Sequence, residues 1–295
     1  MRRGRPSTTA TWVAAWRSLA RYSGERIGGD PIAERLVPEP YAAILRAAGR
    51  APTIARAVQT LARIVTRGQS RHLPLRTRAI DDAIEQAIAR GVRQLVVLGA
   101  GLDARAWRLA ALHEATVFEV DHPSTQAYKR RRVAGLPALA REVRFVESDF
   151  EHGALATSLA NAGHDAARPS VFVWEGVTMY LSRAAIESTL ACVEARSVGG
   201  STLVATYLAR DAFSALRSAV MMAVSTVGEP MRSTFLPHEL AVVLARHGFA
   251  VVEDAGDPDW SVRYLGEAQR TSIERLVVAT RGPAPPSPAT LGAPK

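Results

Sequence analysis

The stretch VVLGAGLDARAWRL, residues 96–109, decides the fold of this chain. Its first residues are aliphatic and β-branched and predict a buried strand, while the residues from Ala104 onward predict a helix. Gly99 and Gly101 lie between these elements, where the chain must turn and where a bare backbone lets a ligand approach closely. Such a turn is typical of nucleotide-binding α/β proteins, but it does not identify the nucleotide.

The alternation of strand and helix continues beyond this stretch. Short apolar runs predict five strands, at 94–99, 116–121, 143–148, 170–175 and 201–208. Helical patterns fill the gaps, at 104–112, 124–133, 154–161 and 184–195, and a later helix is expected at 237–247. Two further apolar runs follow at 249–255 and 273–280. The alternation predicts a mostly parallel sheet with helices on both faces.

The first 90 residues have a different pattern. They contain no convincing strand and predict helices at 12–22, 31–36, 41–48, 54–65 and 76–89. We therefore expect an N-terminal helical cap over 1–90, with about the first ten residues disordered, and an α/β domain over 91–281. A helical insertion is expected at about 211–230, and the proline-rich residues 282–295 are expected to be a disordered tail.

Composition narrows the class of protein. Cys192 is the only cysteine among 295 residues, which excludes an intramolecular disulfide and a cysteine-based zinc site, and we interpret it as a buried thiol. We predict no metal site. No apolar run reaches the roughly 18 residues that a membrane helix needs, and Arg17 interrupts the apolar N-terminal stretch. We therefore expect a soluble, cytoplasmic protein without a membrane partner.

The chain is strongly basic, with a formal net charge of +9. Of its 37 basic residues only Lys129 and Lys295 are lysines, and the arginines are spread through every region. The densest group, KRRR at 129–132, is on a predicted helix, and we interpret it as a solvated surface in preference to a phosphate-binding patch. Basic residues are not interleaved with aromatic ones, so nucleic acid is not the expected partner.

Two ligands fit the glycine turn. Gly99, Gly101 and Ala104 match the GxGxxA spacing of dinucleotide-binding proteins, and an acid follows about 20 residues later at Glu119 or Asp121. An NAD(P)-dependent oxidoreductase is therefore one hypothesis. S-adenosylmethionine proteins use the same architecture. Asp103, at the start of the helix, would oppose a pyrophosphate and favour a positively charged ligand, unless it only caps the helix.

Several blocks of the sequence together resemble the leucine carboxyl methyltransferase family, and especially its bacterial branch of S-adenosylmethionine-dependent methyltransferases. Beside residues 96–109, the matching blocks are DPIAERL (30–36), RTRAIDD (76–82), VFEVDHPSTQAYKRRR (117–132), FVESDFE (145–151), VFVWEGVTMYL (171–181) and GEP (228–230). The resemblance implies a class I methyltransferase fold, a Rossmann-like sheet whose last strand is antiparallel, with N-terminal helices closing over S-adenosylmethionine.

The resemblance also implies cofactor-binding residues. At the methionine end it implies that Arg78 holds the carboxylate, Gly99 the backbone and Glu175 the amino group. The glycine turn itself adds Gly101 and Asp103 to the predicted cofactor-binding residues. An arginine fork suits a carboxylate and a carboxylate suits an ammonium. The alternative for Arg78 is an ion pair with Asp81 or Asp82 on its own helix.

At the nucleoside end the resemblance implies that Asp121 binds the ribose, and that Asp149 and Phe150 surround the adenine. An acid that ends an apolar strand is costly to bury unless it binds a ligand, which favours a functional role for Asp121 and Glu175. Asp149 has the alternative role of a helix cap.

We expect an O-methyltransferase that acts on a carboxyl or hydroxyl group of a small, polyketide-like acidic metabolite. A carboxylate needs no general base, whereas a hydroxyl does, and His122 and, less plausibly, His238 are the candidate bases. His122 precedes Pro123 at a helix start and is better explained as a cap, so no residue is assigned as catalytic. A nucleic-acid methyltransferase and a non-catalytic scaffold remain alternatives.

Overall fold

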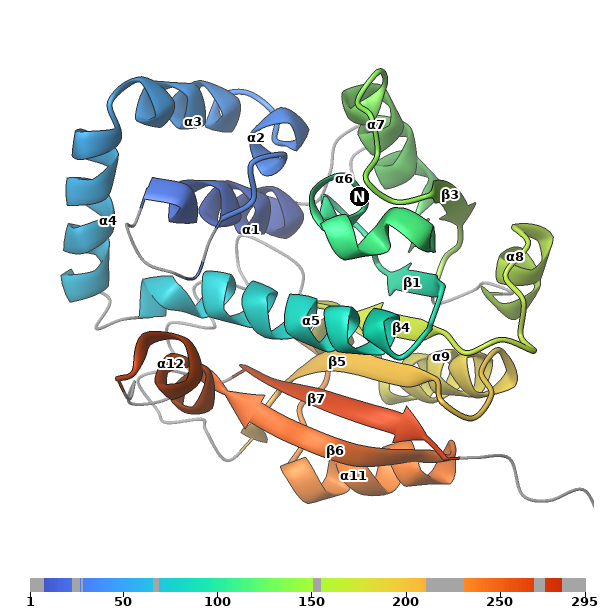
Figure 1. Cartoon of the computed structure of the whole chain (residues 1–295). Helices are drawn as coiled ribbons and strands as arrows, with labels where there is room; N and C mark the ends of the chain where they lie inside the picture. The colour runs from blue at the N-terminus through green and yellow to red at the C-terminus, as the bar shows by residue number, and fades with distance from the viewer. Residues whose placement is uncertain are drawn as a thin grey trace, which may run out of the picture.

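The computed structural model describes residues 8–22, 27, 29–65, 69–150, 155–210, 231–267 and 274–282. Within these residues a seven-stranded sheet has the order β3-β2-β1-β4-β5-β7-β6 (Figure 1). The strands are β1 (Gln94–Leu98), β2 (Thr116–Asp121), β3 (Glu142–Glu147), β4 (Val171–Trp174), β5 (Thr202–Leu208), β6 (Phe249–Gly256) and β7 (Glu274–Arg281).

The sheet is mostly parallel. Strands β1 to β5 pair in parallel, and β7 runs antiparallel to both β5 and β6. This confirms the expected Rossmann-like sheet, including its antiparallel last strand. Because β1 and β4 lie in the middle, the order reverses between them, and open α/β sheets bind ligands where the strand order reverses.

Alternation along β1 divides the core into two layers. Leu95 and Val97 point to one face and pack with the apolar side of α5 (His72–Ala89), whereas Val96 and Leu98 point to the other face and pack with α9 (Arg183–Ala195) and α11 (Pro237–Arg246). All five residues of β1 are buried, as expected of a central parallel strand covered on both faces.

The helices before the sheet are α1 (Thr8–Leu19), α2 (Ala33–Leu36), α3 (Tyr41–Arg50), α4 (Pro52–Val65) and α5. No strand occurs among the described residues that precede Gln94. Helix α1 packs against α2, α3 and α5, and α5 also contacts β4, β5 and β7, so it joins the other helices to the sheet (Figure 1). Residues 8–10, expected to be disordered, form the first turn of α1.

Two helices differ from the prediction. The helix expected at 104–112 is one turn, α6 (Arg105–Arg108), followed by a 3-10 turn at Ala110–Glu114, because Leu109 takes an extended conformation between them. Helix α12 (Asp257–Leu265) was not expected. The Asp259 carboxylate accepts a hydrogen bond from the Gly256 N–H at 2.9 Å, which caps this helix.

The remaining helices, α7 (Pro123–Val133) and α8 (Leu155–Asn161), follow β2 and β3 as predicted. The insertion expected at 211–230, residues 1–7 and residues 283–295 lie outside the described part of the chain.

One interpretation of the basic residues is wrong. Lys129, from the KRRR group, is only 1% exposed and lies 2.6 Å from the Glu119 carboxylate, whereas Arg130, Arg131 and Arg132 are exposed as predicted. A lysine this deeply buried needs a partner charge, and β2 supplies it.

Candidate functional site

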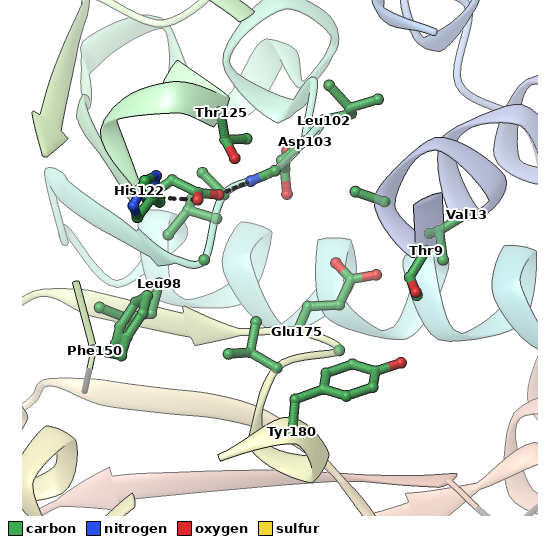
Figure 2. Close-up of a pocket in the computed structure, with 18 of the residues that line it drawn as sticks. Thr9, Val13, Leu98, Leu102, Asp103, His122, Thr125, Phe150, Glu175 and Tyr180 are labelled. Carbon is green, nitrogen blue, oxygen red and sulfur yellow. Dashed lines mark hydrogen bonds between the residues drawn. The ribbon is translucent and has the colours of Figure 1, made fainter. Parts of the chain in front are cut away.

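A cavity of about 440 Å³ opens at the carboxyl ends of the central strands. This volume is within the usual range of small-molecule sites. Figure 2 shows Phe150 and His122 on one side of the cavity and Thr9 and Val13 of α1 on the other, with Glu175 and Tyr180 between them. Seven of the eight predicted cofactor residues line the cavity: Gly99, Gly101, Asp103, Asp121, Asp149, Phe150 and Glu175.

The glycine turn forms the wall beside β1. Gly99 and Gly101 have φ values of +71° and +46°, which L-residues with side chains rarely adopt. A Cβ added to Gly99 would lie 2.5 Å from Val177 Cγ2, another residue of the cavity wall. The turn therefore requires glycine for both its conformation and its close contact, and it exposes backbone to the cavity.

Asp121 closes the turn from the end of β2. Its carboxylate accepts hydrogen bonds from the Gly101 N–H at 2.5 Å and the His122 N–H at 2.6 Å (Figure 2). Burial raises the pKa of this carboxyl, although both backbone donors act in the opposite direction. Of the two acids that fit the spacing, only Asp121 reaches the cavity, because Glu119 is paired with Lys129.

Glu175 follows β4 and carries two arginine partners. Its Oε1 lies 2.8 Å from Arg76 Nη2, and its Oε2 lies 2.8 Å from Arg105 Nη1. Burial alone would raise the pKa of this carboxyl, but the guanidinium groups of Arg105 and Arg76 hold it well below its usual range. Glu175 is therefore an anion that can still accept hydrogen bonds from a cationic ligand.

Asp103 combines the two roles that its position suggested. Its carboxylate lines the cavity, accepts a hydrogen bond from the Arg105 N–H at 2.7 Å and forms an ion pair with the Arg105 side chain. Burial alone would raise the pKa of Asp103, but the Arg105 guanidinium holds it below its usual value. The carboxylate thus stabilises the start of α6 and also presents negative charge beside the turn.

The structure does not bring Arg78 to the cavity. Its side chain is 48% exposed and pairs with Asp82 at 2.8 Å on the same helix, which is the alternative considered from the sequence. Arg76 lines the cavity in its place. The helical period distinguishes the two arginines, because residues four apart lie on the same face of a helix. Arg76 shares its face with the buried Ile80, whereas Arg78 shares its face with Asp82.

The nucleoside side of the cavity comes from the end of β3. Phe150 is half-buried against the hydrophobic core, and Asp149 is exposed at the cavity wall. Ser148 also lines the cavity, and its backbone N–H donates to the Asp121 carbonyl at 3.0 Å. This bond links the end of β3 to the end of β2.

The remaining wall supplies further polar groups, from α1 and from the segments after β4 and β5. Arg17 of α1 lines the cavity and donates to the Leu102 carbonyl at 2.7 Å. Tyr180 and Arg232 line it from the loops after β4 and β5. Sequence patterns missed Arg17 because it occupies the buried face of an otherwise apolar helix.

His122 is committed to capping α7. Its Nδ1 accepts a hydrogen bond from the Ser124 N–H at 3.2 Å and lies 2.8 Å from Ser124 Oγ. The proton of the neutral ring is therefore assigned to Nε2, and Nδ1 is occupied. His238 does not line the cavity.

Other reactive chemistry is limited in the described part of the chain. Burial raises the pKa of the Cys192 thiol to about 11, so it is not a nucleophile at neutral pH. Among the described residues, no group of three His, Cys, Asp or Glu side chains is arranged to hold a metal ion. None of the described helices combines the length and apolar character needed to cross a bilayer.

Comparison with known proteins places this geometry in a family. The model of the leucine carboxyl methyltransferase family matches residues 10–194, which include all eight predicted cofactor residues. A Mycobacterium avium protein named "Putative S-adenosyl-L-methionine-dependent methyltransferase" is 34% identical over 280 residues, covering 91% of this chain and 84% of that protein. A Streptomyces coelicolor protein whose name describes the same activity is 39% identical over 129 residues, but this match spans only 46% of its length.

Solved structures agree on the fold. An O-methyltransferase family protein from Burkholderia thailandensis matches with a TM-score of 0.51 at 16% identity, over 71% of this chain and 57% of that chain. A DUF574 family protein from Streptomyces avermitilis matches with a TM-score of 0.53 at 15% identity, over 94% of this chain and 98% of that chain. At this identity the likeness establishes architecture and not substrate.

Proposed function

Because the chain belongs to the leucine carboxyl methyltransferase family, we propose that it binds S-adenosylmethionine in the 440 Å³ cavity and methylates an oxygen atom of a small acidic acceptor. The observation that carries this proposal is the contact between the Asp121 carboxylate and the glycine turn. Through this contact a carboxylate and the exposed backbone of the glycine turn face the same cavity, which is large enough for a nucleoside ligand. Family membership replaces the dehydrogenase interpretation of the turn.

The nucleoside fits the side of the cavity nearest β2 and β3. Each Asp121 oxygen already accepts one backbone hydrogen bond and keeps a further lone pair, which suits the two hydroxyls of a ribose. Phe150 offers an aromatic face to the adenine, and Asp149 offers an acceptor to its amino group.

The methionine end fits the opposite charges of Arg76 and Glu175. These two side chains are paired at 2.8 Å, so the site presents one cation and one anion to an amino acid that carries one of each. We assign to Arg76 the carboxylate contact that the family resemblance implied for Arg78, and to Glu175 the contact with the amino group. Gly99 then lets the methionine backbone approach the turn.

The donor supplies a methyl group on a positively charged sulfur. An acceptor oxygen attacks the methyl carbon with a lone pair while the carbon–sulfur bond breaks and its electrons return to sulfur. The chain contributes alignment of the reactants and exclusion of water, which α1 provides by covering one side of the cavity.

A carboxylate acceptor fits the cavity better than a hydroxyl. It is already ionised at neutral pH and has no proton to lose, and His122, the imidazole that lines the cavity, has its Nδ1 occupied by the helix cap. Arg232, on the part of the wall not assigned to the donor, favours an anion.

Calorimetric titration with S-adenosylmethionine, S-adenosylhomocysteine and NAD tests the donor. We expect the first two to bind, and Asp121→Ala to weaken binding by about 10- to 150-fold, since it removes charge-assisted hydrogen bonds of about 1.5–3 kcal/mol. Arg76→Met should also weaken binding, whereas its matched control Arg78→Met should not. NAD binding without a response to the methionine ligands would overturn the assignment.

Methyl transfer from labelled donor then tests the acceptor, with carboxylic acids, phenols and RNA offered separately. A carboxylate product is a methyl ester that releases methanol in alkali, whereas a phenol gives a stable ether. We also expect a carboxylate reaction to have little pH dependence between about pH 6 and 8, because a carboxylate acceptor stays ionised over that range and its methylation uses no general base. An alkali-stable product would refute the carboxylate assignment and leave donor binding intact.

A further inference from the structure

Helix α4 turns its bulky aliphatic side chains toward solvent. Ile54, Val58, Leu61 and Ile64 are 66%, 59%, 60% and 66% exposed. Residues 54, 58 and 61 are spaced by four and three, so they form one stripe along the helix. The face packed against the chain carries the small Ala55 instead. The usual arrangement, with bulky apolar residues facing inward, is thus reversed.

The position of α4 leaves this stripe accessible. Helix α4 contacts α3 and the 3-10 turn at Ala20–Tyr22, and it forms an outer edge of the molecule between α3 and α5 (Figure 1). It does not line the proposed donor cavity. The stripe is therefore a separate surface, and its role does not depend on the proposed function.

The charge around the stripe is mainly positive. Residues 40–80 contain eight arginines and no Asp or Glu, in a chain whose net charge is +9. In the neighbourhood of α4, Arg46 is neutralised by Glu39, and Arg71 by Glu267. Arg50 and Arg56 are exposed and form no ion pair with any residue that the structure describes.

We propose that α4 docks in the plane of an anionic lipid surface, with its aliphatic stripe among the upper acyl chains and Arg50 and Arg56 near the lipid phosphates. An amphipathic helix with aliphatic residues on one face, arginine elsewhere and no acid is typical of interfacial binding. Helix α4 has 14 residues, too few to cross a bilayer, so it lies on the membrane and does not span it. The expectation of no membrane partner considered only spanning segments.

A protein partner fits the surface less well. Stable protein interfaces bury about 800 Å² on each partner and are enriched in aromatic anchors. Helix α4 presents a single row of aliphatic side chains about 21 Å long and contains no aromatic residue. A lipid surface needs only such a row together with positive charge.

Vesicle flotation of the full chain tests this inference. The probes are vesicles of phosphatidylcholine alone and of phosphatidylcholine with about one third phosphatidylglycerol. We expect binding to the mixed vesicles that is weaker at high salt. Leu61→Asp should weaken it by roughly tenfold or more, because it puts a charge where the proposed membrane contact would bury apolar area. The matched control is Val242→Asp, at a valine of α11 that is 54% exposed.

A second pair of variants separates charge from burial. Arg56→Gln should weaken binding to the mixed vesicles by about fivefold, and Arg246→Gln, at an exposed arginine of α11, should not. Equal binding to neutral and mixed vesicles, or full binding by Leu61→Asp, would overturn the proposal. A dimer in sedimentation velocity that Leu61→Asp dissociates, without vesicle binding, would assign the stripe to a second copy of the chain.

Discussion

Replacing Arg105 with methionine should destabilise the protein strongly and in a pH-dependent way. The Arg105 side chain is 1% exposed and bonds to three carboxylates: Asp81 at 2.7 Å, Glu175 at 2.8 Å, and Asp103. Removing one partner of a buried ion pair costs about 3–5 kcal/mol, because the remaining charge is left uncompensated. Arg76 still partners Glu175, which argues against a larger cost. We therefore expect a loss of about 3–5 kcal/mol, or roughly 6–10 °C in Tm for a large domain.

The sign of the pH dependence follows from the lowered pKa values of Asp103 and Glu175. Carboxyls with a lowered folded-state pKa contribute stability above their unfolded pKa of about 4, and this stability is lost as the pH falls further. Without Arg105 their pKa values rise, and protonation relieves the uncompensated charge. The difference in stability between wild type and Arg105→Met should therefore be largest near pH 7 and should shrink toward pH 4.

Urea unfolding followed by circular dichroism at pH 7 and pH 4 measures both quantities. Arg78→Met is the matched control, because Arg78 is half exposed and has one partner on its own helix, worth about 0.3–0.5 kcal/mol. A loss of less than about 1 kcal/mol for Arg105→Met, or a deficit that does not change between the two pH values, would refute the electrostatic reasoning.

Three further outcomes are expected. Gly99→Ala should lower the free energy of unfolding by about 2 kcal/mol or more and weaken donor binding, because it combines positive φ with a steric clash. The control Gly135→Ala, with positive φ in open space, should lower the free energy of unfolding by about 1 kcal/mol and bind the donor normally. Thermal unfolding measures the stability and calorimetry the binding. Two carboxylates raise the pKa of His72 to about 10 against its burial, so its stabilisation is complete below about pH 6.5 and is lost as the pH rises toward 10. The Tm difference between wild type and His72→Gln should shrink over that interval, and a constant difference would contradict the assignment. In urea unfolding, Lys129→Met should lower the free energy of unfolding by about 3–5 kcal/mol, and the control Arg131→Met should lower it by less than about 0.5 kcal/mol. Similar values for the two variants would mean that the buried pair between Lys129 and Glu119 is not formed.

The sheet and the glycine turn could be predicted because their signals are local. The apolar runs and the residues Gly99 and Gly101 report the strand, the turn and the backbone conformation directly. Asp121 was found for the same reason, since it ends an apolar strand. Helix α12 was missed because its few residues are mostly polar and follow β6 without a loop.

The charged residues were harder to place because their burial depends on partners far away in the sequence. Lys129 lies in a basic group whose composition predicts exposure, yet it is buried against Glu119, and Arg105 is buried against Glu175. Arginine and lysine are rarely buried unless paired, and a sequence pattern does not show which carboxylate the fold will bring near. Arg76 differs, since the helical period separates it from Arg78.

The arginine that orients Glu175 also connects the candidate site to the last strand. Arg76 pairs with Glu175 at 2.8 Å and with Glu274, the first residue of β7, at 2.7 Å. Glu274 in turn lies 2.8 Å from His72, which bridges to Asp257 at the start of α12. The position of Glu175 in the cavity is thus set from two sides: by the family-matched part of the chain, and by a C-terminal segment outside residues 10–194. A ligand ammonium at Glu175, as proposed, would interact with a charge whose orientation depends on the packing of β7 and α12 against α5. The proposed donor site therefore predicts that donor binding stabilises the docking of these C-terminal elements.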